Sequence, residues 1–242
     1  IHVGDCLEWL RTLPDASVDS CVTDPPYGLG KEPDPREVLA AWLNDERFQP
    51  GGRGFMGKAW DAFVPSPLVW AEVFRVLKPG GHLLAFAGSR TYDWIALGVR
   101  LAGFEIRDQL MWIYGSGFPK SHNVSKAIDR AAGAEREIVG KSARHGGGRC
   151  DGAAWNVSPD VPDITAPATE AARKWDGWHT ALKPAHEPIV LARKPFRGSV
   201  AANVLEHGTG AINVDACRVG VGDIVPGGGN GKASHGGRFG AG

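Results

Sequence analysis

The chain has 242 residues, of which 43% are apolar and 22% charged, a balance typical of one sizeable globular domain. No apolar run approaches the roughly 18 to 20 residues that a membrane-spanning helix needs, and the first residues lack the pattern of a signal peptide, so we expect no membrane partner. Lysine plus arginine and aspartate plus glutamate number 27 each, so the chain has no net charge.

The charge is unevenly distributed along the chain. Residues 1–75 have a net charge of −5, whereas residues 118–150 and residues 171–198 each have a net charge of +4. Clustered lysines and arginines bind polyanions by displacing condensed counterions, so the two basic segments are candidates for contact with a nucleic acid. The alternative is that these charges only solvate surface loops.

The first part of the chain predicts helices and strands in alternation. We expect a short strand at Val3, followed by Asp5 as the N-cap of a helix that ends at Pro14. A β-rich run at 18–23 must end at Asp24-Pro25-Pro26-Tyr27, because prolines cannot donate to a strand ladder. The apolar spacing then predicts, in order, a helix at 37–43, a helix from Ser66-Pro67 to Pro79-Gly80-Gly81, a strand at 82–87, a helix at 92–99, a strand at 104–113, a helix at 124–132 and a strand at 187–193.

This order of elements indicates an α/β fold in which crossover connections join the strands of one sheet. Residues 1–114 form the predicted core, and residues 115–185 interrupt the alternation as a loop-rich insertion with one short helix. Residues 186–219 are expected to return to the core and extend it. Residues 220–242, rich in glycine, are expected to be a loop or tail.

The four cysteines show neither C-x-x-C pairing nor a zinc-type spacing with histidine, so we expect no metal site and a reduced, cytoplasmic protein. Cys6 and Cys21 lie in apolar segments and are predicted to be small buried side chains.

The motif Asp24-Pro25-Pro26-Tyr27 carries the strongest indication of chemistry. In α/β sheets, ligands bind outside the carboxyl ends of strands, which is where this motif is predicted to lie. The stiff Pro-Pro backbone holds two carbonyl oxygens outward, while Asp24 adds a carboxylate and Tyr27 a ring face. Hydrogen-bond acceptors beside an aromatic plate suit a planar base with an exocyclic amino group. The alternative is a plain strand-ending turn.

Asp24-Pro25-Pro26-Tyr27 resembles the signature of the DNA amino-methyltransferases, which methylate adenine N6 or cytosine N4 with S-adenosylmethionine. Further segments are similar to the opening of these enzymes, to the helix-to-strand turn of methyltransferase folds, and to a phage and prophage branch with a permuted (beta-type) order of motifs. These segments are 3–7, 13–19, 75–81, 115–121, 182–188 and 208–215. The resemblance implies a Rossmann-like methyltransferase fold with three layers and a mostly parallel sheet.

The resemblance also implies a cofactor loop, Phe-x-Gly-x-Gly, late in the chain. No such motif follows Arg193. Phe86-Ala87-Gly88-Ser89-Arg90 is similar to it but follows the wrong element and ends in arginine, so we interpret it as a turn at the sheet edge. We therefore expect the cofactor loop to lie beyond Gly242 and the fold to be incomplete at its C-terminus.

By resemblance, catalysis belongs to Asp24, Pro25, Pro26 and Tyr27, and cofactor binding to Asp5, Cys6, Asp24 and Pro25. The expected partner is double-stranded DNA with the target base flipped out, because a stacked base cannot reach such a pocket. The insertion at 115–185 lies where similar enzymes carry target recognition. Its candidates for phosphate contact are Lys120, Lys126, Arg130, Lys141, Arg144 and Arg149.

The leading hypothesis is a site-specific DNA methyltransferase acting on adenine N6, because the signature begins with Asp rather than Ser. Cytosine N4 is the alternative within the same class. A catalytically inactive DNA-binding relative is the alternative of another class, motivated by the missing glycine loop, and methylation of a protein glutamine is a weaker one. The expected setting is the cytoplasm of a bacterium, from a bacterial or phage gene. The sequence leaves the oligomeric state open, with a homodimer as one alternative.

Overall fold

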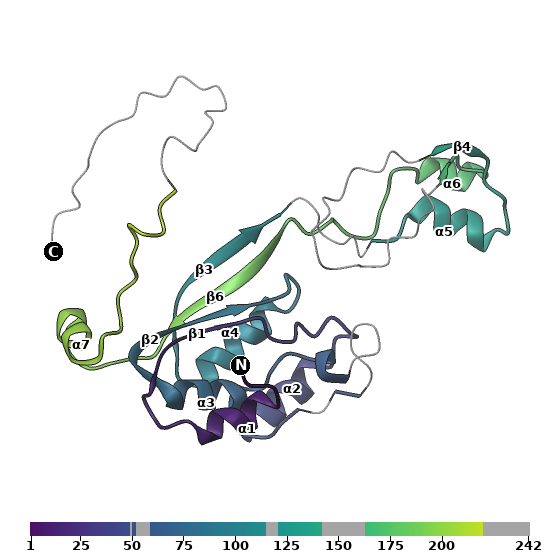
Figure 1. Ribbon diagram of the computed structural model, residues 1–242. Helices are drawn as coiled ribbons and strands as arrows, with labels where there is room; N and C mark the ends of the chain where they lie inside the picture. Colours follow the sequence, from purple (N-terminus) through teal and green to yellow (C-terminus); the bar gives the residue numbers. More distant parts are fainter. Residues whose placement is uncertain (49, 52–58, 115–120, 142–162, 220–242) are drawn as a thin grey trace. The chain divides into compact units, whose positions relative to one another are not determined.

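The computed structural model of the chain describes residues 1–48, 50–51, 59–114, 121–141 and 163–219 (Figure 1). The chain divides into a compact unit, Ile1–Gly210, and a second unit, Ala211–Gly242. In the second unit, the described residues 211–219 contain a turn but no helix or strand. The predicted tail, residues 220–242, lies outside the described residues. Among the described helices, none is long and apolar enough to cross a membrane.

A four-stranded sheet forms the centre of the first unit, with strands in the order β1-β2-β6-β3. The strands are β1 (Val18–Thr23), β2 (Leu77–Phe86), β3 (Glu105–Ile113) and β6 (His186–Arg193). β1 and β2 are parallel, whereas β6 is antiparallel to both β2 and β3. The sheet is therefore mixed rather than mostly parallel in its pairings, because β6 enters between β2 and β3 from the opposite direction.

The strand directions bring four chain segments together at one edge of the sheet. β1, β2 and β3 run in the same direction, so their carboxyl ends share that edge, and the antiparallel β6 begins there. Residues that follow β1, β2 and β3 and residues that open β6 are consequently neighbours, although they are far apart in sequence.

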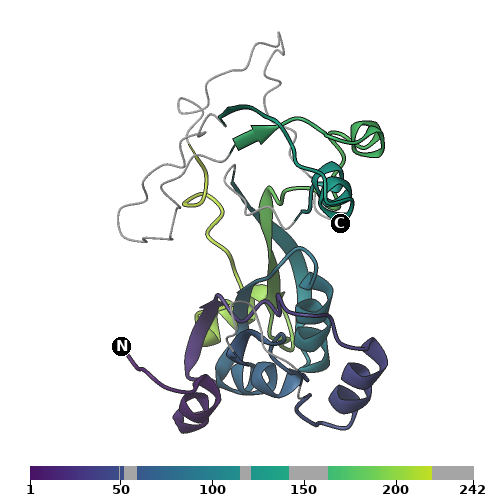
Figure 2. The same ribbon diagram turned by 90° about the vertical axis from the view of Figure 1, so that its right-hand side faces the viewer.

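Helices α1 (Cys6–Thr12), α2 (Pro35–Leu43), α3 (Pro67–Val76) and α4 (Tyr92–Leu101) lie on one face of this sheet (Figures 1 and 2). Their apolar sides enclose one core with alternate residues of the strands. Fully buried members of this core include Val38, Trp70, Leu83, Ile95, Val99, Val190 and Ala192. The α/β class is confirmed, while the third layer implied by the resemblance is not found among the described helices α1–α4.

The opposite face of the sheet carries a second set of apolar side chains. Cross-strand register places Leu84 opposite Leu191, and Phe86 and Leu110 both opposite Ile189, so these side chains point to the face away from α1–α4. Trp112 also lies there, 58% exposed, with its ring 5.7 Å from that of Phe86.

Two boundaries differ from the predicted ones. The helix opened by Pro67 ends at Val76, and β2 starts directly at Leu77 rather than after the glycine pair. Strand β2 includes this segment because Gly80 N donates to Lys194 O and Lys194 N donates to Gly81 O, which extends the pairing with the β6 side of the sheet. The predicted strand at Val3 does not form, since residues 1–3 have no ladder partner and lie exposed before α1.

The described part of the insertion is more ordered than predicted. Besides the expected helix α5 (Val124–Ala131), it contains the antiparallel pair β4 (Ile138–Lys141) and β5 (Asp163–Thr165), and α6 (Glu170–Lys174). After β6, the chain forms α7 (Val200–His207), a helix that the apolar spacing did not predict. α7 is held to β2 because Asn203 Nδ2 donates to Pro79 O at 3.1 Å.

Candidate functional site

The motif Asp24-Pro25-Pro26-Tyr27 directly follows β1, as predicted, at the sheet edge where the strands' carboxyl ends meet. Its backbone is held from two sides. The side chain of Asp61, 6% exposed, accepts hydrogen bonds at Oδ1 from Tyr27 N (3.0 Å) and Gly28 N (3.2 Å). On the other side, Thr91 Oγ1 donates to Tyr27 O at 2.6 Å. These contacts fix the turn before any ligand arrives.

Gly28 completes the turn because its backbone adopts φ = +65°, a conformation that residues other than glycine rarely adopt. A Cβ there would lie 3.1 Å from Phe63 Cα and Val64 N. The chain therefore packs its backbone directly against 63–64, and this close approach keeps Asp61 within reach of the motif.

The four side chains of the motif have different exposure. Asp24 is exposed, Pro25 is buried, and Pro26 and Tyr27 are half-buried. An exposed carboxylate beside a partly covered ring leaves Asp24 available to a ligand while the backbone behind it stays rigid.

The hydroxyl of Tyr27 donates to Glu187 Oε2 at 3.1 Å, across the sheet edge to the start of β6. Burial, and then the neighbouring carboxylates of Asp24 and Glu187, raise the pKa of Tyr27, so the phenol stays protonated. Burial and Glu187 also raise the pKa of Tyr114, the residue after β3. Two carboxylates and two phenols thus gather at the sheet edge where β1 and β3 end and β6 begins.

Phe86-Ala87-Gly88-Ser89-Arg90 forms the turn between β2 and α4, as interpreted from the sequence. Thr91 N donates to Gly88 O at 3.1 Å and so closes the turn. A Cβ at Gly88 would lie 3.1 Å from Thr91 Oγ1 and 3.6 Å from Tyr27 Cβ, which shows how closely this turn packs on the motif.

The expected cofactor contacts near the N-terminus have a structural role in the chain itself. Asp5 is the N-cap of α1, as predicted, and its Oδ1 accepts from Leu7 N (2.8 Å) and Glu8 N (3.1 Å). Cys6 is exposed, so the prediction of a buried side chain is wrong there. It occupies the first position of a helix that buries none of its residues. Cys21 is half-buried in β1. No described hydrogen bond joins Asp5 or Cys6 to Asp24.

Three of the six candidates for phosphate contact fall on described residues. Lys126 and Arg130 are exposed, one helical turn apart on α5, whose N-cap Asn123 accepts from Lys126 N at 2.9 Å. Lys141, by contrast, forms an ion pair with Asp163 at 2.5 Å across the β4–β5 pair, which partly neutralises its charge. Lys120, Arg144 and Arg149 lie outside the described residues.

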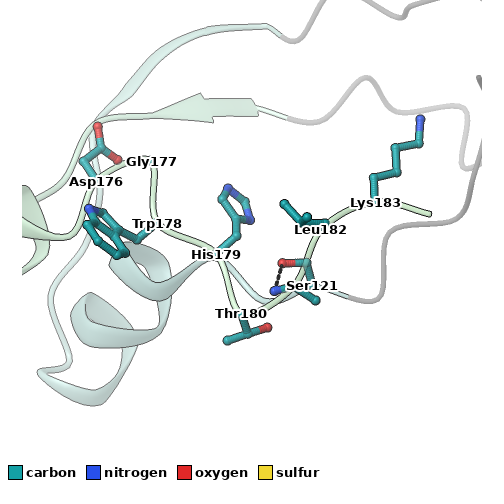
Figure 3. A pocket seen from close by; sticks show the side chains of 9 residues that line it. Ser121, Asp176, Gly177, Trp178, His179, Thr180, Leu182 and Lys183 are labelled. Atoms are coloured by element: carbon teal, nitrogen blue, oxygen red, sulfur yellow. Dashed lines mark hydrogen bonds between the residues drawn. The ribbon is translucent and has the colours of Figure 1, made fainter. Parts of the chain in front are cut away.

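A pocket of about 670 Å³ opens beside the start of α5 (Figure 3). Residues 176–183 and Ser121 line it. The lining segment is tied to the residues before α5, because Val124 N donates to Trp178 O and Ala181 N donates to Ser121 Oγ. Trp178, 59% exposed, contacts Trp175 edge to face. The segment offers aromatic and polar side chains at the start of α5, the helix that carries the two exposed cations, and the sequence did not indicate this pocket.

The family model described as DNA methylase, of the N6/N4 type, matches residues 18–197, and the chain belongs to this family.

Two curated relatives are named as methyltransferases. The chain is 24% identical to the type II methyltransferase M.HindIII of Haemophilus influenzae over 238 residues, which cover 88% of this chain and 64% of that protein. It is 32% identical to the DNA adenine methyltransferase YhdJ of Escherichia coli over 116 residues, 48% of this chain and 33% of that protein. The chain thus spans less than two thirds of the length of these relatives.

Among solved structures, a putative DNA modification methylase from Thermus thermophilus, complexed with S-adenosyl-L-methionine, is similar with a TM-score of 0.38 and 21% identity. The match covers 82% of this chain and 54% of that one.

Proposed function

We propose that this chain carries the catalytic motif and the DNA-binding segment of an S-adenosylmethionine-dependent DNA methyltransferase, which methylates the exocyclic amino group of a flipped-out base. The observation that carries the proposal is the rigid Asp24-Pro25-Pro26-Tyr27 turn at the carboxyl edge of the sheet, in a chain of the DNA methylase family. Asp24 is exposed there while the backbone behind it is held by Asp61 and Thr91.

The amino group of adenine or cytosine is a poor nucleophile because its lone pair is delocalised into the ring. Asp24 and the Pro25 carbonyl each accept one of its two N–H bonds, and this draws the nitrogen toward a tetrahedral shape with a localised lone pair. The Asp24 carboxylate also stabilises the positive charge that develops on the nitrogen, a type of contribution that is usually large in catalysis. Because both acceptors are held in fixed positions, they also orient the amino group for the reaction.

The target base leaves the duplex at a cost of a few kcal/mol, and stacking offsets part of it. Tyr27 provides the ring face, and stacking on an aromatic side chain contributes roughly 1 to 3 kcal/mol per base in single-strand binders. The half-buried position of Tyr27 leaves one part of the ring available while the rest is fixed by the protein.

The residues proposed to hold the cofactor are Asp5, Cys6, Asp24 and Pro25. The exposed carboxylate of Asp24 suits a group that carries a sulfonium cation, whereas the Asp5 carboxylate has one oxygen engaged with the start of α1. When bound, S-adenosylmethionine supplies an electrophilic methyl group. Asp24 serves both partners of the reaction, because it lies at the end of β1 with its carboxylate free of ion pairs among the described residues.

Residues 115–185 are proposed as the target-recognition segment, with residues 1–114 and 186–219 as the catalytic core. Lys126 and Arg130 of α5 would contact phosphates, and residues 176–183 offer side chains that can reach base edges. Double-stranded DNA is the proposed substrate, with adenine N6 favoured over cytosine N4. We also propose that the enzyme has the permuted order of motifs and belongs to the phage and prophage branch of the family.

The experiment incubates the full-length polypeptide with unmethylated plasmid DNA and S-adenosylmethionine, digests the DNA to nucleosides, and analyses them by mass spectrometry. The proposal expects N6-methyladenine. N4-methylcytosine instead would assign the enzyme to the alternative target. Specific DNA binding with no methylated nucleoside would favour the catalytically inactive relative.

A further inference from the structure

Glu187 is a second carboxylate of the site. It lies in the segment 182–188, which the resemblance included without giving Glu187 a role. It is the second residue of β6 and lies opposite Trp112 of β3, at the same sheet edge at which β1 ends. Its Oε2 accepts the hydroxyl proton of Tyr27, a residue 160 positions earlier in the chain. Only the antiparallel insertion of β6 between β2 and β3 brings the two together.

A second tyrosine converges on the same carboxylate. Tyr114 follows β3, and its N donates to Ala185 O at 2.9 Å, which continues the β3–β6 ladder past Glu187. The Glu187 side chain also interacts with the Tyr114 hydroxyl. One carboxylate therefore has two phenols as neighbours, one from each side of the strand to which it belongs.

A hydrogen bond from a phenol to a carboxylate is charge-assisted and stronger than one between neutral groups. A tyrosine ring is set by only two torsions, so fixing the hydroxyl end as well as the backbone end leaves the ring little freedom. Asp61 and Thr91 hold the Tyr27 backbone, and Glu187 holds the far end of the ring. The ring is thus already ordered in the free protein, so the conformational entropy of ordering it is not lost when a base binds.

This arrangement also determines which part of Tyr27 a ligand meets. The single hydroxyl proton is directed to Glu187, and the hydroxyl also interacts with the Asp24 carboxylate, so Tyr27 offers a ligand its ring face rather than a free hydrogen-bond donor. Because any base can stack on a ring face, discrimination between adenine and cytosine must come from other contacts.

We propose that Glu187 is a positioning residue that holds Tyr27 and Tyr114 as aromatic walls of the base pocket and acts through these rings rather than on the reacting atoms. This inference rests on the proposed function.

The first experiment tests, in the protein without DNA or cofactor, whether the Glu187 side chain contacts the hydroxyls of Tyr27 and Tyr114. Tyrosine labelled with ¹³C at Cζ gives one resonance for each of the three tyrosines, assigned by single Tyr→Phe variants. Glu187→Ala should shift the resonances of Tyr27 and Tyr114 and leave that of Tyr92 in place. Glu187→Gln, whose amide oxygen still accepts a hydrogen bond, should shift them less. The control Glu105→Gln neutralises a carboxylate at the other end of the β3–β6 pair and should move neither. An unchanged Tyr27 resonance in Glu187→Ala would overturn the inference.

The second experiment measures labelled methyl transfer to unmethylated plasmid DNA in the full-length polypeptide. Glu187→Ala and Tyr27→Phe should each lower kcat by about 10-fold, because a base on a poorly oriented ring spends less time in the reactive geometry. The double variant should be no slower than the slower of the two single variants, because the Tyr27–Glu187 hydrogen bond can be lost only once, although Tyr27→Phe also removes the contact of the Tyr27 hydroxyl with Asp24. Glu187→Gln should restore most of the activity.

Two results of the kinetic experiment would contradict the positioning role. Additive losses in the double variant would mean that Glu187 and Tyr27 act separately, and a Glu187→Gln variant as slow as Glu187→Ala would mean that the charge acts on the reacting amino group. The resonance experiment contains neither DNA nor cofactor. Its failure therefore overturns only the role of Glu187, whereas a wild-type protein without methyl transfer overturns the proposed function.

Discussion

The smallest scale of the site is a set of single residues that hold one turn in place. Asp24-Pro25-Pro26-Tyr27 could be located from the sequence because the signature is local and ends a strand. Asp61, Thr91 and Glu187 could not, since their partners in the motif are 34, 64 and 160 positions away. An aspartate in a polar stretch such as that around Asp61 carries no local sign that it will be buried and will accept two backbone N–H groups.

We predict that Asp61→Ala destabilises the fold by about 1 to 3 kcal/mol, because it leaves the N–H groups of Tyr27 and Gly28 without their acceptor in a partly buried turn. Asp61→Asn should cost much less, since the amide oxygen can accept both hydrogen bonds. Denaturant unfolding followed by circular dichroism measures both values. Equal stability of the alanine variant and the wild type would show that the turn does not depend on this side chain.

At the scale of elements, the insertion is organised by a buried ion pair that the sequence did not reveal. Asp129 of α5, 1% exposed, pairs with Arg136 at 2.5 Å and accepts hydrogen bonds from Ala168 N and from Thr169 N and Oγ1. Arg136 also donates to Thr165 in β5. These contacts connect α5, β5 and the start of α6, and they explain why a segment predicted to be mostly loop contains four elements.

The hydrogen bonds and the Arg136 pair outweigh the cost of burial and lower the pKa of Asp129 from 3.8 to about 2. Because the folded pKa lies below the unfolded one, Asp129 contributes stability that is complete above pH 3.8 and lost as the pH falls toward 2. We predict that Asp129→Asn lowers stability at neutral pH and removes this part of the acid dependence.

Denaturant unfolding at a series of pH values between about 5 and about 2 measures this dependence. Asp176→Asn, at an exposed aspartate of the same segment, is the matched control and should keep the wild-type profile. An acid profile in Asp129→Asn identical to that of the wild type would show that Asp129 does not hold these elements together.

The exposed cations of α5 give a prediction about DNA. Lys126→Gln with Arg130→Gln should weaken binding to all sequences alike and reduce the slope of log affinity against log salt by about 0.9 per phosphate contact removed. Lys141→Gln should change the slope less, because Lys141 is already paired with Asp163. Fluorescence anisotropy over a salt series measures the slopes. If the slope of the double variant stays at the wild-type value, α5 only presents solvated charges and the DNA path lies elsewhere.

At the scale of the whole molecule, the alternation of helices and strands was predictable because apolar spacing is a local property. Helices α2, α3, α4 and α5 and strands β1, β2, β3 and β6 were all expected near their observed places. The order β1-β2-β6-β3 was not, since nothing local in residues 186–193 shows that they enter between β2 and β3 in the reverse direction. That single topological fact brings Glu187 to Tyr27 and creates the site.

The burial of surface residues was equally hard to predict. Cys6 lies in an apolar stretch, yet α1 buries none of its residues, because burial depends on what packs against a helix rather than on its own composition. The same holds for Trp112, which alternates correctly for a strand and lies on the face away from α1–α4.

In the proposed reaction, Asp24 acts on the amino group of the target base while basic residues elsewhere supply most of the affinity for DNA. The most direct measurement compares Asp24→Ala with the control Asp93→Ala, an exposed aspartate of α4, in the full-length polypeptide, using labelled S-adenosylmethionine for methyl transfer and anisotropy for DNA binding. We predict that Asp24→Ala loses at least about 10²-fold in methyl transfer while it binds DNA as the wild type does. Near-normal turnover in a folded Asp24→Ala protein would contradict this role of Asp24.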